Sequence, residues 1–183
     1  MDKQPQLRAL EKEISDFVVR RTSKAPVPGE GSASAPVFFV GEAAGANEER
    51  TGRPFVGRAG KLLTGLIENQ LHMRREQVYI TSVVKWRPPD NRKPLKDEIE
   101  ACMPFLNRQL DLIQPKLIVL LGNTALNSVL DHDMKIGAVH GRIIEKEGRR
   151  YFPTYHPAAG LRATRWKKAL EQDFVQLALE LEK

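Results

Sequence analysis

Three side chains with the means to do chemistry follow predicted strands. Glu42 comes directly after the apolar run 37–40, Ser82 lies in a strand predicted over 77–84, and His156 follows the last predicted strand. Because the carboxyl ends of parallel strands meet at one edge of a sheet, we expect these side chains to lie close together. A carboxylate, a hydroxyl and an imidazole in one cleft could orient water and donate a hydrogen bond to a substrate. Taken singly, Glu42 could instead cap a helix and His156 could hold a turn, so the prediction of a reaction site rests on all three.

Two glycine-rich loops surround the carboxylate. The first reads Gly-Glu-Ala-Ala-Gly over 41–45, and the second, 52–60, places three glycines around a proline and Phe55. Small residues let backbone N–H groups approach a ligand closely. A phosphate-binding loop needs Ser or Thr where residues 60–62 read Gly-Lys-Leu, and the glycines do not have the spacing of a dinucleotide fingerprint. The loops therefore indicate a ligand slot of another kind, with an ordinary strand–loop–helix connection as the plainer alternative.

Helical and strand patterns alternate along the chain. Apolar spacing predicts helices over 4–21, 58–71, 95–113 and 163–182, and a short helix that ends near residue 130. Strands are predicted over 37–40, 77–84 and 116–121, followed by a hairpin over 142–152 that turns at Gly148. This alternation predicts an α/β fold, a three-layer α/β/α sandwich around a central, mainly parallel four-stranded sheet.

We expect a single domain over residues 1–183, long enough to bury about 70% of the unfolded surface. Within it, 1–35 would form an N-terminal helix and a flexible connector rich in Pro, Gly and Ser, and 36–183 would form the core. Residues 88–94 contain three prolines and are predicted to be an irregular basic loop.

The charge balance is basic. There are 29 Lys and Arg residues against 23 Asp and Glu, which gives a net charge of +6. Basic residues gather in two segments, listed here in chain order: Lys85, Arg87, Arg92, Lys93 and Lys96, then Arg162, Arg165, Lys167 and Lys168. This distribution is compatible with a polyanionic partner, although solvated surface charge is the simpler explanation.

Composition also bounds location and metal chemistry. No apolar run approaches the roughly 20 residues of a membrane span, and residues 1–30 lack the apolar segment of a signal peptide. We therefore expect a cytoplasmic protein without a membrane partner. The one cysteine, Cys102, excludes an internal disulfide and any metal site made of cysteines alone.

Four motifs together resemble the uracil-DNA glycosylase superfamily, with its order and spacing from about residue 36 onward. They are the loop 41–45, the run Thr-Gly-Arg-Pro-Phe-Val-Gly-Arg-Ala-Gly at 51–60, Val-Val-Lys-Trp-Arg-Pro-Pro-Asp-Asn-Arg at 83–92, and His-Pro-Ala at 156–158. The nearest resemblance is to the family-four enzymes, which normally hold a 4Fe–4S cluster. It implies a single-domain, monomeric DNA glycosylase that hydrolyses the N-glycosidic bond of uracil, or another deaminated base, and so initiates base-excision repair. No lysine lies where Schiff-base chemistry would need it, so a monofunctional enzyme is expected.

The resemblance also implies roles for individual residues. Backbone N–H groups of Gly41, Ala43 and Ala44 would bind base oxygen atoms, with Ser82 at the base edge. Glu42 would orient water or stabilise the sugar cation, and Phe55 would stack on a base flipped out of the duplex. His156 would donate a hydrogen bond to the base oxygen as negative charge develops. The implied catalytic residues are Glu42 and His156.

DNA contacts are implied for residues around the basic loops and the histidine motif. Leu161 and Arg162 stand where the family inserts a wedge into the duplex. Contacts to the DNA backbone are implied for Arg58, Lys85, Arg87, Asn91, Arg92 and Lys93.

Two departures from the family pattern matter. Cluster-bearing relatives supply four cysteines, but here Trp86 stands at the third position and only Cys102 remains. One thiolate cannot hold a cluster that takes four, so we expect no cofactor and no metal. We expect Trp86 and apolar residues of the N-terminal helix to fill the vacated volume.

The second departure is Ser82, where relatives usually have Asn. A hydroxyl cannot give the base edge both a donor and an acceptor at the positions an amide spans, which puts uracil selectivity in question. Alanine also replaces a proline that relatives often have in the 41–45 loop. Three outcomes stay open: uracil excision with weaker selectivity, excision of hypoxanthine or xanthine, and a DNA-binding protein with weak or lost catalysis. A nucleotide-binding α/β module is disfavoured because its motifs are missing.

Overall fold

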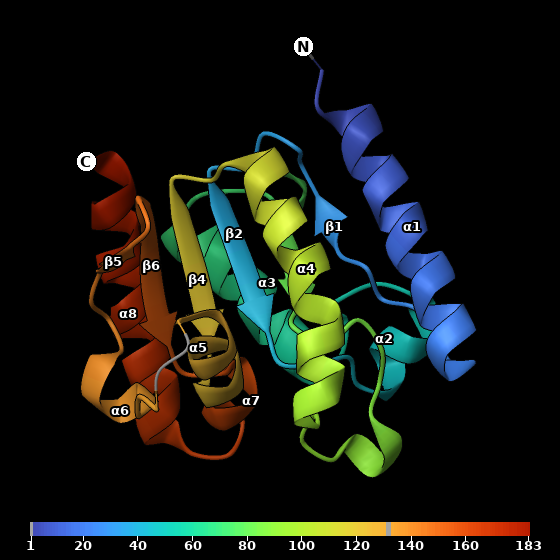
Figure 1. Cartoon of the computed structure of the whole chain (residues 1–183). Coiled ribbons are helices and arrows are strands. Elements are labelled where there is room, and N and C mark those ends of the chain that lie inside the picture. The colour runs from blue at the N-terminus through green and yellow to red at the C-terminus, as the bar shows by residue number, and fades with distance from the viewer. Residues whose placement is uncertain (1, 131–132) are drawn as a thin grey trace.

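The computed structural model describes residues 2–130 and 133–183. In these residues the sheet has six strands in the order β1-β3-β2-β4-β6-β5 (Figure 1). The bounds are β1 Glu30–Gly31, β2 Val37–Gly41, β3 Tyr79–Ser82, β4 Leu117–Leu121, β5 Ile144–Lys146 and β6 Arg149–Thr154. The four central strands are parallel, whereas β1 and β5 add to the two edges in antiparallel orientation.

The sheet is thus wider than the predicted four strands. The parallel centre matches the prediction, and β5 with β6 forms the predicted hairpin, in which Gly148 adopts a φ of +73°. The strand β1 lies inside the segment expected to be a flexible connector. It is only two residues long, and Gly31 has a φ of +134° that a side chain would oppose, so no periodic pattern announces it.

The five predicted helices are present within a few residues of their expected bounds, together with three short helices that had no periodic signal. The helices are α1 Gln4–Thr22, α2 Ala46–Thr51, α3 Arg58–Gln70, α4 Lys96–Ile113, α5 Asn123–Leu130, α6 Ile136–Val139, α7 Pro157–Gly160 and α8 Thr164–Glu182. None of the helices in the described residues is both long and apolar enough to cross a membrane.

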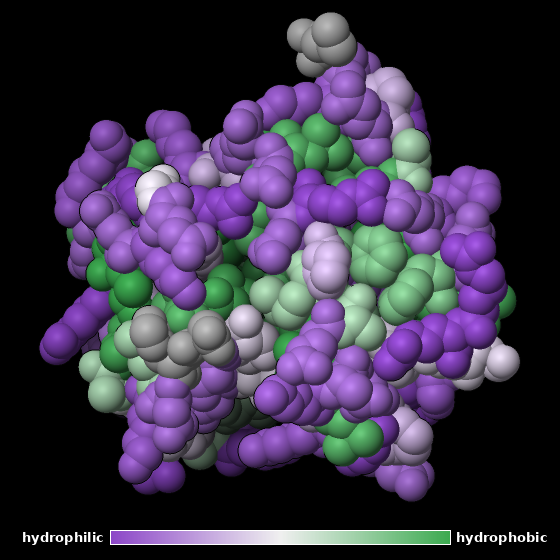
Figure 2. Space-filling model, viewed as in Figure 1, coloured by the Kyte–Doolittle hydropathy of each residue, from purple (hydrophilic) through white to green (hydrophobic). Residues whose placement is uncertain are grey.

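The sheet separates two apolar cores. Phe38 and Val40 of β2 pack in the core that contains buried residues of α1, α4 and α5, whereas Val37 and Phe39 point to the core of α3 and α8. The alternation follows from the two-residue period of a strand, and it gives helices on both faces of the sheet (Figure 1). On the face shown in Figure 2, hydrophilic residues cover most of the surface and apolar residues appear between them in small patches.

Trp86 lies in the first of these cores. It is buried in the same cluster as Leu10 and Ile14 of α1 and Cys102 of α4. Trp86 and apolar residues of the N-terminal helix therefore share one core, and that they fill the volume of a cluster stays a prediction.

Parallel register brings the chemistry to one edge of the sheet. Gly41 at the end of β2 pairs with Ser82 at the end of β3, and Leu121 of β4 pairs with Thr154 of β6. The loops that follow these strands consequently open on the same side, at the lower edge of the sheet in Figure 1.

Candidate active site

A cleft of about 770 Å³ opens at the carboxyl ends of the parallel strands. Most residues singled out in the sequence line it: Glu42, Ala43, Ala44, Phe55, Arg58, Ser82, Asn91, Arg92, Lys93, His156, Leu161 and Arg162. They come from segments far apart in the chain, which the sheet brings together. The expected convergence of the three strand ends is therefore present.

Glu42 is held from two sides. The backbone N–H of Val84 donates to the carbonyl of Glu42 at 3.1 Å, and the hydroxyl of Thr124 donates to its Oε2 atom. Thr124 lies in the first turn of α5, which follows β4. Sequence reasoning gave this residue no role in the site, although its place after a buried strand could have marked it.

His156 has a defined tautomer when neutral. Its Nδ1 atom accepts a hydrogen bond from the backbone N–H of Ala158 at 3.1 Å, so the proton must be on Nε2. Burial lowers the pKa of His156, with Arg162 acting in the same direction and Glu42 and Glu48 opposing. The imidazole is therefore a neutral hydrogen-bond donor at the wall of the cleft.

Phe55 is 7% exposed and its ring centroid lies 5.5 Å from that of His156. The ring covers Gly41, where an added Cβ would come within 2.5 Å of it. Ser82, nearly buried, stands beside this glycine, since the same Cβ would lie 3.2 Å from its Oγ atom. Glycine at 41 is thus required for the Phe55 ring to pack this closely against the end of β2.

Glu48 joins the two glycine loops. Its Oε1 atom accepts from the N–H groups of Val56 and Gly57 at 2.9 and 3.0 Å, and its Oε2 atom accepts from Gly45 at 3.2 Å. Sequence reasoning missed this residue. An acidic side chain in the first turn of a helix, directly after a glycine loop, was the available signal.

Comparison with known protein families identifies the family of this chain. Residues 28–180 match the family described as the Uracil DNA glycosylase superfamily. The chain belongs to the uracil DNA glycosylase superfamily. Membership makes it an enzyme of the DNA glycosylase type, a hydrolase of N-glycosyl bonds, as the motifs predict.

Individual relatives agree. The chain is 48% identical over 162 residues to the "Type-4 uracil-DNA glycosylase" of Sulfurisphaera tokodaii, covering 82% of this chain and 72% of the relative. It is 41% identical over 167 residues to the type-4 enzyme of Archaeoglobus fulgidus, covering 87% and 83%. It is 48% identical over 138 residues to that of Thermotoga maritima, covering 74% and 71%. The resemblance to family-four glycosylases is therefore confirmed.

One implied DNA contact of this glycosylase is wrong. The side chain of Lys85 is 0% exposed, and its Nζ atom donates to Thr81 Oγ1, the Ser82 carbonyl and Gln109 Oε1 at 2.7, 2.8 and 2.8 Å. Burial lowers its pKa to about 7, although Cys102 and Glu11 act in the opposite direction. The lysine faces the core because three acceptors there replace its water, so it cannot reach a phosphate.

Two arginines of the basic loop are engaged within the protein. Arg87 donates to Glu49 at 3.1 Å and to Asn91 at 2.8 Å, and it does not line the cleft. Arg92 makes two hydrogen bonds to Glu98, at 2.7 and 2.9 Å. These pairs brace the proline-rich loop, which contains a single 3-10 turn at Pro89–Asn91.

The residues present do not fit the cluster of the family-four enzymes. A 4Fe–4S cluster takes four cysteine thiolates, and the whole sequence has one cysteine. That residue, Cys102, is buried, and burial raises the pKa of its thiol, which disfavours the thiolate that binds metal. Among the described residues, no three His, Cys, Asp or Glu side chains are grouped to hold a metal ion.

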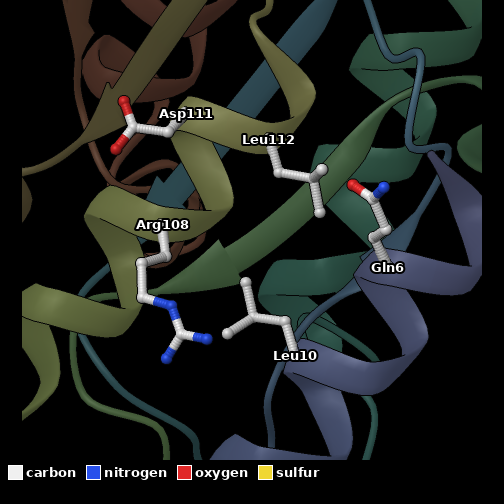
Figure 3. Close-up of a pocket in the computed structure, with 5 residues that line it drawn as sticks. All are labelled: Gln6, Leu10, Arg108, Asp111 and Leu112. Carbon is white, nitrogen blue, oxygen red and sulfur yellow. The ribbon is translucent and has the colours of Figure 1, made fainter. Parts of the chain in front are cut away.

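A second hollow of about 360 Å³ lies between α1 and α4 (Figure 3). It is lined by Gln6, Leu10, Arg108, Asp111 and Leu112, and Arg108 already pairs with Glu13 at 2.7 Å. None of the residues implied by the glycosylase motifs reaches it. Most of the motif residues line the cleft at the strand ends instead.

Proposed function

We propose that the protein excises uracil from DNA as the first step of base-excision repair. The observation that carries the proposal is the meeting of Glu42, Phe55 and His156 in one cleft, each in the segment that bears its family motif. A pure DNA-binding protein has no need of all three. The type-4 uracil-DNA glycosylases among the relatives support the choice of substrate.

In the proposed reaction the target nucleotide leaves the stack and its base enters the cleft, because the glycosidic bond is inaccessible within a duplex. Phe55 stacks on the base, and backbone N–H groups of the 41–45 loop bind its oxygen atoms. Stacking of this kind stabilises bound bases by about 1–3 kcal/mol. The cleft volume of about 770 Å³ is ample for one nucleotide.

Cleavage then breaks the bond between C1′ of deoxyribose and the base nitrogen. The electron pair leaves with the base, and the Nε2–H group of His156 stabilises the charge that develops on the base oxygen. The carboxylate of Glu42, oriented by Thr124, positions a water molecule whose oxygen bonds to C1′ and whose proton passes to solvent, while the departing base anion takes up a proton from solvent. The products are free base and an abasic site, and the strand remains intact because no amine attacks the sugar.

The rim of the cleft carries the proposed contacts to DNA. Leu161 is 49% exposed and follows α7 directly, which suits a wedge that unstacks the duplex. Arg162 follows it in the chain, and Arg58, Asn91, Arg92 and Lys93 also line the cleft, where they would bind phosphates. We further propose that the enzyme works without an iron–sulfur cluster, since Trp86 and Cys102 share one apolar core.

A second candidate function, excision of hypoxanthine or xanthine, rests on Ser82. This residue lines the cleft at the end of β3, and its hydroxyl offers the base edge a shorter and less specific contact than an amide would. A larger base edge could be accommodated where an Asn side chain is missing.

One assay tests both candidates. Labelled oligonucleotides that carry uracil, hypoxanthine or xanthine, single-stranded and paired, are incubated with the protein and cleaved with alkali. Abasic sites are expected from the uracil substrate, and Glu42→Ala and His156→Ala should each lower the rate about 100-fold or more with little change in DNA affinity. If no abasic sites form on any substrate at enzyme excess, the proposed glycosylase activity is wrong. If both variants keep the wild-type rate, the assignment of Glu42 and His156 as catalytic residues is wrong.

A further inference from the structure

Phe55 has a backbone conformation that is unusual for a bulky residue. Its φ is +50°, in the left-handed region that aromatic side chains rarely adopt. This conformation directs the ring against Gly41 and toward His156, so something outside the ring must hold the backbone. The residues that do so lie on other elements.

Arg75 reaches the backbone of Phe55 from the turn that precedes β3. Its Nη1 atom donates to the Phe55 carbonyl at 3.0 Å and to Thr64 Oγ1 at 3.2 Å, and its Nη2 atom donates to the Pro54 carbonyl. The side chain is only 11% exposed. One planar guanidinium therefore binds two consecutive carbonyl groups, a geometry that a lysine cannot reproduce.

Glu30 holds the guanidinium in turn. Its Oε1 atom lies 2.6 Å from Nε of Arg75, and β1, where Glu30 lies, is fixed to β3 by antiparallel pairing. Burial raises the pKa of Glu30, but hydrogen bonds from Arg53 and Arg75 outweigh it and lower the pKa, so the carboxylate stays ionised. Glu30 and Arg75, together with the Pro54 and Phe55 carbonyl groups, form an arrangement that we call the clamp. The edge strand β1, which no sequence pattern predicted, thus holds the clamp in place.

Gly60 leaves room for the carbonyl group of Phe55. A Cβ atom at this position, in the first turn of α3, would overlap the carbonyl group of Phe55. The carbonyl group of Phe55 therefore packs closely against Gly60 while its oxygen accepts the hydrogen bond from Arg75. The ring position follows from the position of this carbonyl.

We propose that Arg75 is a positioning residue that sets the base-stacking face of Phe55 through the Pro54 and Phe55 carbonyl groups. The inference rests on the proposed function, in which this ring stacks on the flipped base. Without the clamp, the backbone of Phe55 can relax to negative φ and the ring leaves Gly41. The loss falls on recognition of the base, whereas contacts to DNA phosphates are untouched.

A matched control lies on the same carboxylate. Arg53 binds Glu30 at 2.7 Å with a side chain that is 58% exposed, and within the described residues this side chain donates to Glu30 and not to Phe55. Arg53→Met and Arg75→Met therefore make the same chemical change and each remove one partner of Glu30. Only the second removes the clamp.

The test compares these variants by kinetics and by inhibition with free uracil, the proposed product. Arg75→Met is expected to lower kcat and to weaken inhibition by uracil, each about tenfold or more, with affinity for undamaged DNA within about twofold of wild type. Arg53→Met should stay within about twofold throughout. In a Phe55→Leu background, Arg75→Met should add little, because its effect passes through the ring. Equal behaviour of the two arginine variants, or full additivity with Phe55→Leu, would overturn the inference.

A readout without activity separates this inference from the proposed function. The ring current of Phe55 acts on His156, whose ring lies 5.5 Å away, so the imidazole proton resonances should shift in Arg75→Met as in Phe55→Leu, but not in Arg53→Met. Absence of excision by the wild type would defeat the proposed function, and this spectrum would still decide the role of Arg75. If Arg75→Met does not fold, Arg75→Lys is compared with Arg53→Met in its place. Histidine spectra and uracil inhibition like those of the wild type in Arg75→Lys would contradict the proposed role of Arg75.

Discussion

The Nδ1 atom of His156 accepts a hydrogen bond from the backbone N–H of Ala158, two residues along the chain. This contact fixes the proton on Nε2 and directs a neutral donor into the cleft. It also means that protonation of Nδ1 would break a hydrogen bond and set two donors against each other. The loop geometry and the low pKa of the imidazole therefore favour the same neutral form.

We predict that His156 titrates below the ordinary histidine value of 6.5, since burial lowers its pKa. Below about pH 6.5 the unfolded chain then binds a proton at His156 that the native chain does not bind. This residue therefore has no effect on the free energy of unfolding above about pH 6.5 and lowers it as the pH falls toward the native pKa. Glycosylase activity should decline over the same acidic range. An NMR titration, with His156→Gln to identify the resonances, checks both the pKa and the Nε2–H tautomer; a raised pKa would contradict the prediction.

We predict that Thr124 acts through Glu42, because its hydroxyl donates to the carboxylate. Thr124→Val should lower kcat about tenfold with KM little changed, and Glu42→Gln should lower it about 100-fold or more. Combining the two should add little beyond Glu42→Gln alone. Thr22→Val, at the end of α1, is the matched control, since its hydroxyl donates to the Val18 carbonyl and accepts from the backbone N–H of Lys24, and neither group belongs to the site. A Thr124→Val enzyme as fast as this control would refute the assignment.

We predict that Lys85 makes stability depend on pH. Its native pKa of about 7 lies far below the ordinary 10.5, so between these values the unfolded chain binds a proton that the native chain lacks. Stability from this group therefore rises with pH from about 7 upward, by at most about 1.4 kcal/mol per pH unit, and is lost again as the pH falls toward 7. Urea unfolding of Lys85→Met from pH 7 to 9 should show a flatter dependence than wild type.

Lys93→Met supplies the control for this experiment, because Lys93 is exposed. It should leave the pH dependence of stability unchanged while weakening DNA binding and reducing its salt dependence. Lys85→Met should change the pH dependence of stability and leave DNA binding and its salt dependence unchanged. A salt-dependent loss of DNA affinity in Lys85→Met, without any change in stability, would restore the role that the sequence suggested.

We predict that Ser82 sets base preference. Ser82→Asn introduces an amide at the end of β3 and should raise the ratio of uracil to hypoxanthine excision at least about tenfold. Excision rates on matched oligonucleotides measure the ratio. An unchanged ratio would show that selectivity lies elsewhere in the cleft.

We predict that protein purified with or without air has no absorbance band near 400 nm and no stoichiometric iron or sulfide. The physical reason is the single cysteine, which leaves a cluster three ligands short. Iron and sulfide analysis on protein of known concentration makes the measurement. Stoichiometric amounts of both would contradict the prediction.

Much of the fold was predictable because its signals are local. Alternating helical and strand periods indicated the parallel sheet, and the residue that follows each strand could be placed at one edge. The strand β1 was not predicted, because two residues are too few to show an alternating apolar pattern. Lys85 was misplaced for a related reason, since a charged residue in a basic stretch gives no local sign that Thr81, Ser82 and Gln109 will surround it.

The sequence by itself determined the family, the slot between the glycine loops and the identities of Glu42, Phe55 and His156, because these depend on residue type and spacing along the chain. Only the tertiary structure decided how those side chains are held. Thr124 lies 82 positions from Glu42, and Arg75 lies 20 positions from Phe55 on a different element. Such contacts depend on how strands and loops pack against one another, and the apolar periodicity of the sequence does not predict them.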